Sequence, residues 1–149
     1  MTDRNDEIST LNTLTATLID SGYEDAAANS DAGRFREMFR ERATERQSCV
    51  EDLRAEVRRL GGNPEDDGSF MGKTHQRFLD LKAALTGRDE KAIINEVERG
   101  EDYLKEKFET ALNSEHLSGE SRTVVESAFQ SVRAGHDQMS QLKHGMEAD

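Results

Sequence analysis

The chain has one cysteine, one proline and no tryptophan among its 149 residues. A single thiol, Cys49, cannot form an internal disulfide, and only Pro64 would interrupt a helix. No stretch approaches the roughly 20 apolar residues needed to span a bilayer. The N-terminus MTDRNDEIS also lacks the apolar run of a secretory signal. We therefore expect a cytoplasmic protein that has no transmembrane helices.

Hydrophobic and charged residues each make up 34% of the chain, and the net charge is −11. So few apolar residues favour helices with one apolar stripe around a narrow aliphatic core. Residues 1–149 fit a single domain large enough to bury that core. The negative charge would repel phosphate backbones and anionic lipid surfaces, which argues against nucleic-acid or membrane partners.

Apolar residues recur at spacings of three and four over four long segments, which predicts four helices. The first segment covers about residues 5–29. The second begins after Asn29–Asp31 and ends at Gly61 and Gly62. The third starts near residues 86–89, and the fourth follows the expected cap Ser118. No sustained alternation of β-branched residues indicates a strand.

The connections between these segments differ in length, and this difference predicts the topology. The first two helices are so close in sequence that they should form an antiparallel hairpin. Residues 62–87 form a long connection that begins with GGNPEDDGS and contains a short apolar pattern typical of an extra helix. Two hairpins joined by one long crossover correspond to an all-α, ferritin-like up-down four-helix bundle.

Each predicted helix has a polar or glycine interruption near the middle of its apolar stripe. In chain order the interruptions are Gly22 with Tyr23, Arg46, Glu101, and Gly135 with His136. In an antiparallel bundle these positions could meet at one level. We predict a buried polar layer in which Arg46 pairs with Glu101 while Tyr23 and His136 add hydrogen bonds. The layer could fix the helix register, or it could form a site for a small ligand or a metal ion.

Several segments resemble an uncharacterised bacterial family of ferritin-like four-helix-bundle proteins, a domain of unknown function. They are LNTLTATLIDSGYEDAA, LRAEVRRLGGNPEDDGS, LDLKAALTGRDEKAI, VERGEDYLKEKFETAL and SVRAGHDQM. The similarity extends over nearly the whole chain, and RRLGGNPEDDGS and ERGEDYL are its most specific parts. It implies the ferritin-like fold. It implies no activity, and a connection with stress rests on this resemblance alone.

The wider ferritin-like superfamily binds two metal ions through one Glu on each of two helices and a Glu-x-x-His motif on each of the other two. No histidine here has a glutamate three residues before it, since these positions hold Gly72, Asn113, Arg133 and Gln141. The counterpart of the motif on the second helix is either Glu45 with Ser48 or Arg46 with Cys49. A guanidinium at Arg46 would repel a metal ion, because it stays protonated.

We therefore expect a non-enzymatic protein that acts through interaction or assembly, with a protein partner or as a homo-oligomer and without a cofactor. The alternative is an iron- or manganese-binding protein, or an oxidoreductase, with a non-standard set of ligands. Its candidates are Glu24, Glu45, Glu98, Glu101 and His136, although a solvated surface position is the default for Glu24 and Glu98. A third possibility is a small-ligand pocket opened by Gly22, Gly100 and Gly135.

Overall fold

A computed structural model describes residues 4–19, 33–64 and 90–148, and these residues form four α-helices without any strand. The helices are α1 (Arg4–Ile19), α3 (Gly33–Arg59), α5 (Glu90–Asn113) and α6 (Gly119–Ala148). The all-α class predicted from the sequence is confirmed for the described residues. The first helix was expected to reach residue 29, and residues 20–32 lie outside the described part. The short helix expected within 62–87 lies almost wholly outside it too.

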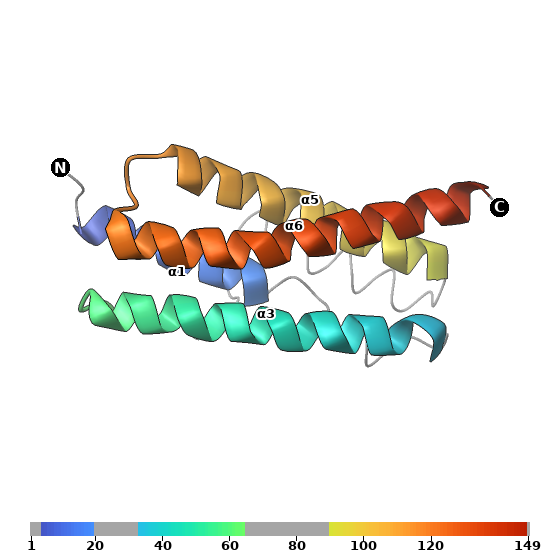
Figure 1. The fold of residues 1–149 in the computed structure, drawn as a ribbon, viewed down its shortest axis with the longest axis horizontal. Helices are drawn as coiled ribbons and strands as arrows, with labels where there is room; N and C mark the ends of the chain where they lie inside the picture. Colours follow the sequence, from blue (N-terminus) through green and yellow to red (C-terminus); the bar gives the residue numbers. More distant parts are fainter. Residues whose placement is uncertain (1–3, 20–32, 65–89, 149) are drawn as a thin grey trace.

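The four helices lie side by side along one long axis (Figure 1). Gly62 after α3 lies against Ile8 of α1, and Ser118 before α6 binds Glu7 of α1, so these three segments share one end of the bundle. At the other end Phe35 of α3 packs with Ile93 of α5. Helices α1 and α6 therefore run in one direction, and α3 and α5 run in the opposite one.

Helix α3 ends at Arg59 in the hydrogen-bond pattern of a Schellman motif. The amide of Gly61 donates to the Arg58 carbonyl at 3.0 Å, and the amide of Gly62 donates to the Val57 carbonyl at 2.9 Å. Gly61 has a φ of 86°, a conformation that favours glycine. A Cβ at Gly62 would lie 2.7 Å from Ile8 Cγ2, so the second glycine lets α1 approach closely. The helix stop predicted at Gly61 and Gly62 is confirmed.

The turn between α5 and α6 is held by side chains from two helices. Arg122 of α6 donates to the carbonyls of Leu112 at 2.7 Å and Ser114 at 3.1 Å, which satisfies acceptors at the end of α5. Glu7 of α1 is buried, and its Oε2 accepts bonds from both the amide and the hydroxyl of Ser118, each at 2.8 Å. These bonds fix the start of α6 against α1.

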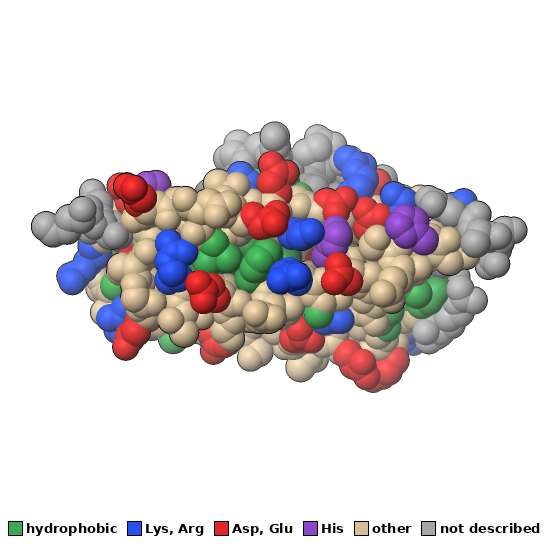
Figure 2. Space-filling view, turned by 45° about the horizontal axis from the view of Figure 1, so that its top comes forward, with side chains coloured by type: hydrophobic (Ala, Val, Ile, Leu, Met, Phe, Trp, Pro, Cys, Tyr) green, Lys and Arg blue, Asp and Glu red, His purple; other side chains and the backbone are tan. Residues whose placement is uncertain are grey.

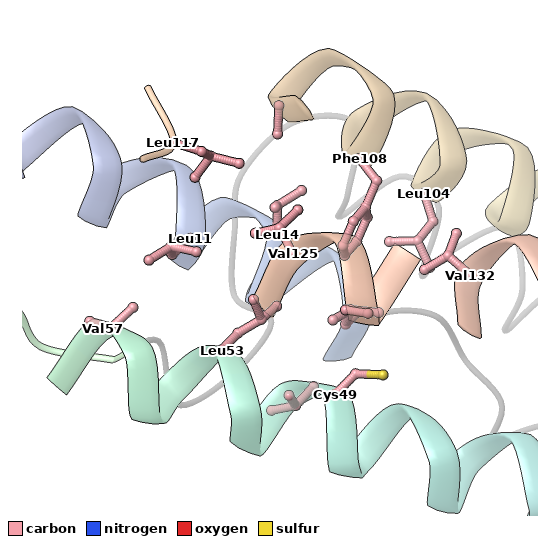
Figure 3. Packing of buried hydrophobic residues seen from close by; sticks show 14 of the residues in the cluster. Leu11, Leu14, Cys49, Leu53, Val57, Leu104, Phe108, Leu117, Val125 and Val132 are labelled. Carbon is pink, nitrogen blue, oxygen red and sulfur yellow. The ribbon is translucent and has the colours of Figure 1, made fainter. Parts of the chain in front are cut away.

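The apolar core is divided into two clusters along the bundle. The larger contains residues of all four helices, and Figure 3 shows leucine, valine and phenylalanine side chains of this cluster pointing toward one another. The smaller consists of Phe35 and Phe39 of α3, Ile93, Ile94 and Val97 of α5, and Met139 of α6. On α3 and α5 the residues between the two clusters include Arg46 and Glu101.

None of the helices in the described part of the chain is both long enough and apolar enough to cross a membrane. Helices α3 and α6, the two longest, carry charged residues throughout.

Candidate functional site

Arg46 and Glu101 form a bidentate ion pair inside the bundle. Arg46 Nη1 donates to Glu101 Oε1 at 2.8 Å, and Nη2 donates to Oε2 at 2.5 Å. The relative exposure of Arg46 is 2% and that of Glu101 is 0%. The two parallel bonds match the flat guanidinium to the flat carboxylate, which is the strongest geometry for this pair of groups. The structure thus brings together the two residues that the interrupted stripes predicted to pair.

Helical periodicity explains why both side chains point inward. Arg46 lies one turn before Val50 on α3, and Glu101 lies one turn after Val97 on α5, so each continues a buried stripe. An isolated charge at such a position would be very costly, because protein interiors solvate ions poorly. In this pair each buried charge is compensated by the opposite charge of the other residue.

The predicted polar layer has two further residues, Tyr23 and His136. Tyr23 lies outside the described residues. His136 is partly exposed, and its Nε2 lies 2.5 Å from Asp102 Oδ1, while Nδ1 lies 3.3 Å from Asp137 Oδ1. Asp102 is the neighbour of Glu101 on α5 and points about 100° away from it around the helix. His136 therefore connects α5 and α6 nearer the surface, which corrects its predicted position in the buried layer.

Among the candidate metal ligands that the structure describes, no three lie together. Glu24 is outside the described residues, and Glu45 accepts bonds from Arg42 and from the Ser131 hydroxyl. Glu98 is buried and pairs with Lys143 Nζ at 3.2 Å, so its expected solvated position is corrected. Glu101 uses both oxygens to bind Arg46. Within the described ranges, no group of three or more His, Cys, Asp or Glu residues could hold a metal ion.

Comparison with known proteins matches residues 6–114 to a family described as a domain of unknown function, DUF2383. The chain belongs to this family. No curated protein and no solved structure matches the chain. The predicted resemblance to a domain of unknown function is thereby confirmed. Both members of the buried pair lie within the DUF2383 span, whereas α6 lies beyond its end.

Cys49, also within the DUF2383 span, is a buried core residue. Burial raises the pKa of its thiol, while a hydrogen bond with Ser131 and the nearby charge of Arg46 act in the opposite direction. A thiol that remains protonated is a poor nucleophile. This agrees with the sequence-based interpretation of Cys49 as a small residue of the apolar stripe.

Another buried carboxylate, which the sequence analysis missed, connects the DUF2383 span to α6. Glu56 of α3 is 5% exposed. Its Oε2 accepts a bond from the Ser121 hydroxyl at 2.6 Å, and Arg59 donates to both of its oxygens. The hydrogen bond from Arg59 lowers the pKa of Glu56, the bond from Ser121 acts in the same direction, and burial opposes them. An ionised Glu56 therefore helps to hold α6 on α3.

We expect Glu56→Gln to lower the free energy of unfolding at neutral pH by about 1–3 kcal/mol, the usual worth of hydrogen bonds to a charged group. The pKa of Glu56 in the folded protein is lower than its ordinary value of 4.5. The stabilisation is therefore fully present at pH values above 4.5, and it is lost as the pH falls through the pKa of the folded state. Urea unfolding of both proteins at neutral and acidic pH should show the difference shrinking on acidification.

The matched control is Glu51→Gln on the same helix. Glu51 pairs with Arg54 at 2.8 Å, but half of its side chain is exposed, so the change should be below about 0.5 kcal/mol. Equal losses in the two variants, or a difference that does not depend on pH, would contradict the role given to Glu56.

Proposed function

We propose that this chain is a non-enzymatic cytoplasmic helical-bundle protein that acts by binding a protein partner or further copies of itself, and that it requires no cofactor. The Arg46–Glu101 pair serves in this proposal as a structural element that fixes the register of α3 and α5. The main support is the geometry of this pair, which fills the junction between the two apolar clusters with a closed, bidentate contact.

The chemistry of the pair argues against an ion at this place in the core. Both Glu101 oxygens already accept a hydrogen bond from Arg46, so a metal ion bound to either oxygen would share that oxygen with the guanidinium. The guanidinium would then lie a few ångströms from the ion with its charge intact, because it does not lose its proton in proteins. Two like charges a few ångströms apart repel strongly in a medium of low dielectric constant.

We further propose that the bundle has ferritin-like connectivity. Helices α3 and α5 run in the same direction, so α3 ends and α5 begins at opposite ends of the bundle. One long crossover between two antiparallel hairpins is the topology of ferritin-like folds. In this proposal the fold is kept while the inward carboxylate at Glu101 serves an ion pair, and residues 1–149 form a single domain.

Metal content decides between this proposal and the metal-binding alternative. Untagged protein purified from cells supplied with iron and manganese should contain close to no metal per chain by elemental analysis. About two ions per chain, the complement of ferritin-like di-metal sites, would overturn the proposal. In that outcome Glu101→Ala should lose the metal if Glu101 is a ligand.

The interaction part of the proposal is tested separately on the same preparation. Light scattering after size-exclusion chromatography should show an oligomer, or a stoichiometric partner should copurify with the chain. A metal-free monomer that retains no partner would contradict a role in interaction or assembly.

A further inference from the structure

The four described helices form two pairs, and each pair packs closely within itself. Helix α1 packs on α3, and α5 packs on α6, and both of these contacts are more extensive than those between the pairs. Within the second pair, His136 contacts Asp102 and Lys143 binds Glu98. We call α1 with α3 the N-terminal pair, and α5 with α6 and the turn between them the C-terminal pair.

The interface between the two pairs contains three carboxylates that are almost fully buried. Each of them binds a residue of the other pair: Glu7 binds Ser118, Glu56 binds Ser121, and Glu101 binds Arg46. A buried charge without a partner is costly, so these contacts allow only one way of packing the pairs. The interface therefore joins one face of the N-terminal pair to a different, complementary face of the C-terminal pair.

The connection between the two pairs is much longer than the turn within the C-terminal pair. Helix α3 ends at Arg59 and α5 begins at Glu90, so 30 residues (60–89) lie between them, whereas five (114–118) join α5 to α6. The long connection joins opposite ends of the bundle, because α3 and α5 run in the same direction. Helix α3 is about 40 Å long, and 30 residues can span up to about 100 Å. The connection is therefore long enough to place the C-terminal pair in the bundle of a second copy.

The interface between the pairs is also more apolar than the outer face that Figure 2 shows. On that face, hydrophobic side chains lie in small groups between acidic and basic ones. The larger apolar cluster lies inside the bundle and contains residues of all four described helices. Permanent interfaces between copies of a chain are usually rich in apolar groups. An assembly that uses the internal interface needs no apolar patch on the outer face.

We propose that two copies of the chain exchange their C-terminal pairs. Each bundle of the dimer then contains α1 and α3 of one copy and α5 and α6 of the other. Every copy carries both complementary faces, so the dimer keeps all contacts between the pairs and closes on itself. This inference rests on the proposed function, because it states how copies of the chain bind one another.

The exchange has a kinetic consequence. The dimer can return to monomers only if the interfaces between the pairs open, which separates Arg46 from Glu101 and exposes the larger apolar cluster. Dissociation after dilution should therefore be no faster than unfolding of the bundle. A dimer held by an outer surface would separate without opening the bundle.

The test places the two charges of the buried pair on different chains. The Arg46→Glu variant has two carboxylates at this place in its own chain, and the Glu101→Arg variant has two guanidinium groups. When the two full-length variants are refolded together from urea, exchange gives one bundle the native pair and the other bundle the reversed pair. The mixture should elute at twice the chain mass with both chains in equal amounts. Its urea midpoint should be about 1 M higher than that of either variant refolded alone.

The matched control uses Glu51 and Arg54, which form an ion pair at 2.8 Å within α3. Exchange cannot complement Glu51→Arg with Arg54→Glu, because both partners stay on one helix, so their mixture should gain no stability. If either core variant fails to fold alone, the refolded mixture remains decisive, because a folded product then requires both chains.

A mixture of the core variants that is no more stable than its components would overturn the exchange. An oligomeric wild type in that case would still support the proposed function, through a different interface between copies. The proposed function fails on a separate result, a wild-type monomer that retains no partner.

Discussion

Arg46→Ala is expected to lower the free energy of unfolding by about 3–5 kcal/mol, the usual cost of removing one partner from a buried ion pair. The variant leaves the Glu101 carboxylate fully buried and without the two donors it has in the wild type. Its charge must then be neutralised by a proton or reached by water, and both cost free energy. Urea unfolding followed by circular dichroism measures the change directly.

The loss of stability in Arg46→Ala comes from the buried Glu101 charge that is left without a partner. A second variant measures the net contribution of the ion pair to stability separately. Arg46→Met/Glu101→Leu replaces both ions by apolar groups of similar length, and such replacements are often neutral or stabilising by about 1–4 kcal/mol. Arg40→Ala is the surface control, because its contact with Glu37 at 3.6 Å is well exposed and should contribute below about 1 kcal/mol. A loss below about 0.5 kcal/mol in Arg46→Ala would show that the pair is not buried.

If the double variant keeps the fold but forms different oligomers or loses a partner, the pair contributes specificity and not stability. Buried polar groups of this kind can define the register of packed helices, because any slip separates the two charges. For Arg46 and Glu101, a slip of one turn between α3 and α5 would leave each charge facing an apolar neighbour.

The pairing of Arg46 with Glu101 was predictable because each residue interrupts an otherwise regular apolar stripe. Periodicity specifies which face of a helix is buried, and a charge on that face requires a partner. The apolar stripes have only a few such interruptions. Among them, Arg46 and Glu101 have opposite charges and can form an ion pair. The end of α3 was predictable for a similar reason, since two glycines in succession allow the positive φ that Gly61 adopts.

The contacts around α6 could not be predicted in the same way. Glu7 and Glu56 are two of 31 acidic residues, and nothing local distinguishes them from solvated ones. Their partners, Ser118 and Ser121, lie 111 and 65 positions away in the chain. Such contacts depend on how the helices are rotated against one another, which a stripe several residues wide does not specify.

His136 shows that a small error in the predicted rotation of a helix about its axis changes the contacts of a side chain. The sequence predicts that His136 adds hydrogen bonds to the buried layer of Arg46 and Glu101, and in the structure it contacts Asp102, the residue after Glu101 on α5. One residue corresponds to about 100° around a helix, which separates the core from the surface. Glu98 shows the opposite error, because it was expected at the solvated surface and is buried. Its charge is compensated there by Lys143 of α6.

Phe108→Ala is expected to lower the free energy of unfolding by about 3–5 kcal/mol, the range found when large aromatic residues are truncated in cores. Phe108 is 0% exposed and stacks on Phe129, and it lies beside Leu104 in the larger cluster (Figure 3). Tyr103→Ala, one turn or so earlier on the same helix but partly exposed, should cost about 1 kcal/mol because it loses mainly its contact with Lys107. Urea unfolding of both variants gives the comparison.

The same truncation also tests how α5 and α6 are held together. Removing the Phe108 ring takes away the stacking partner of Phe129, so α5 and α6 should lose a contact between the two helices in addition to core volume. Phe108→Leu, which keeps most of the apolar volume, should recover much of the stability but not the flat contact with Phe129. If both Phe108 variants unfold at the same urea concentration as the wild type, the helices are not packed through this residue.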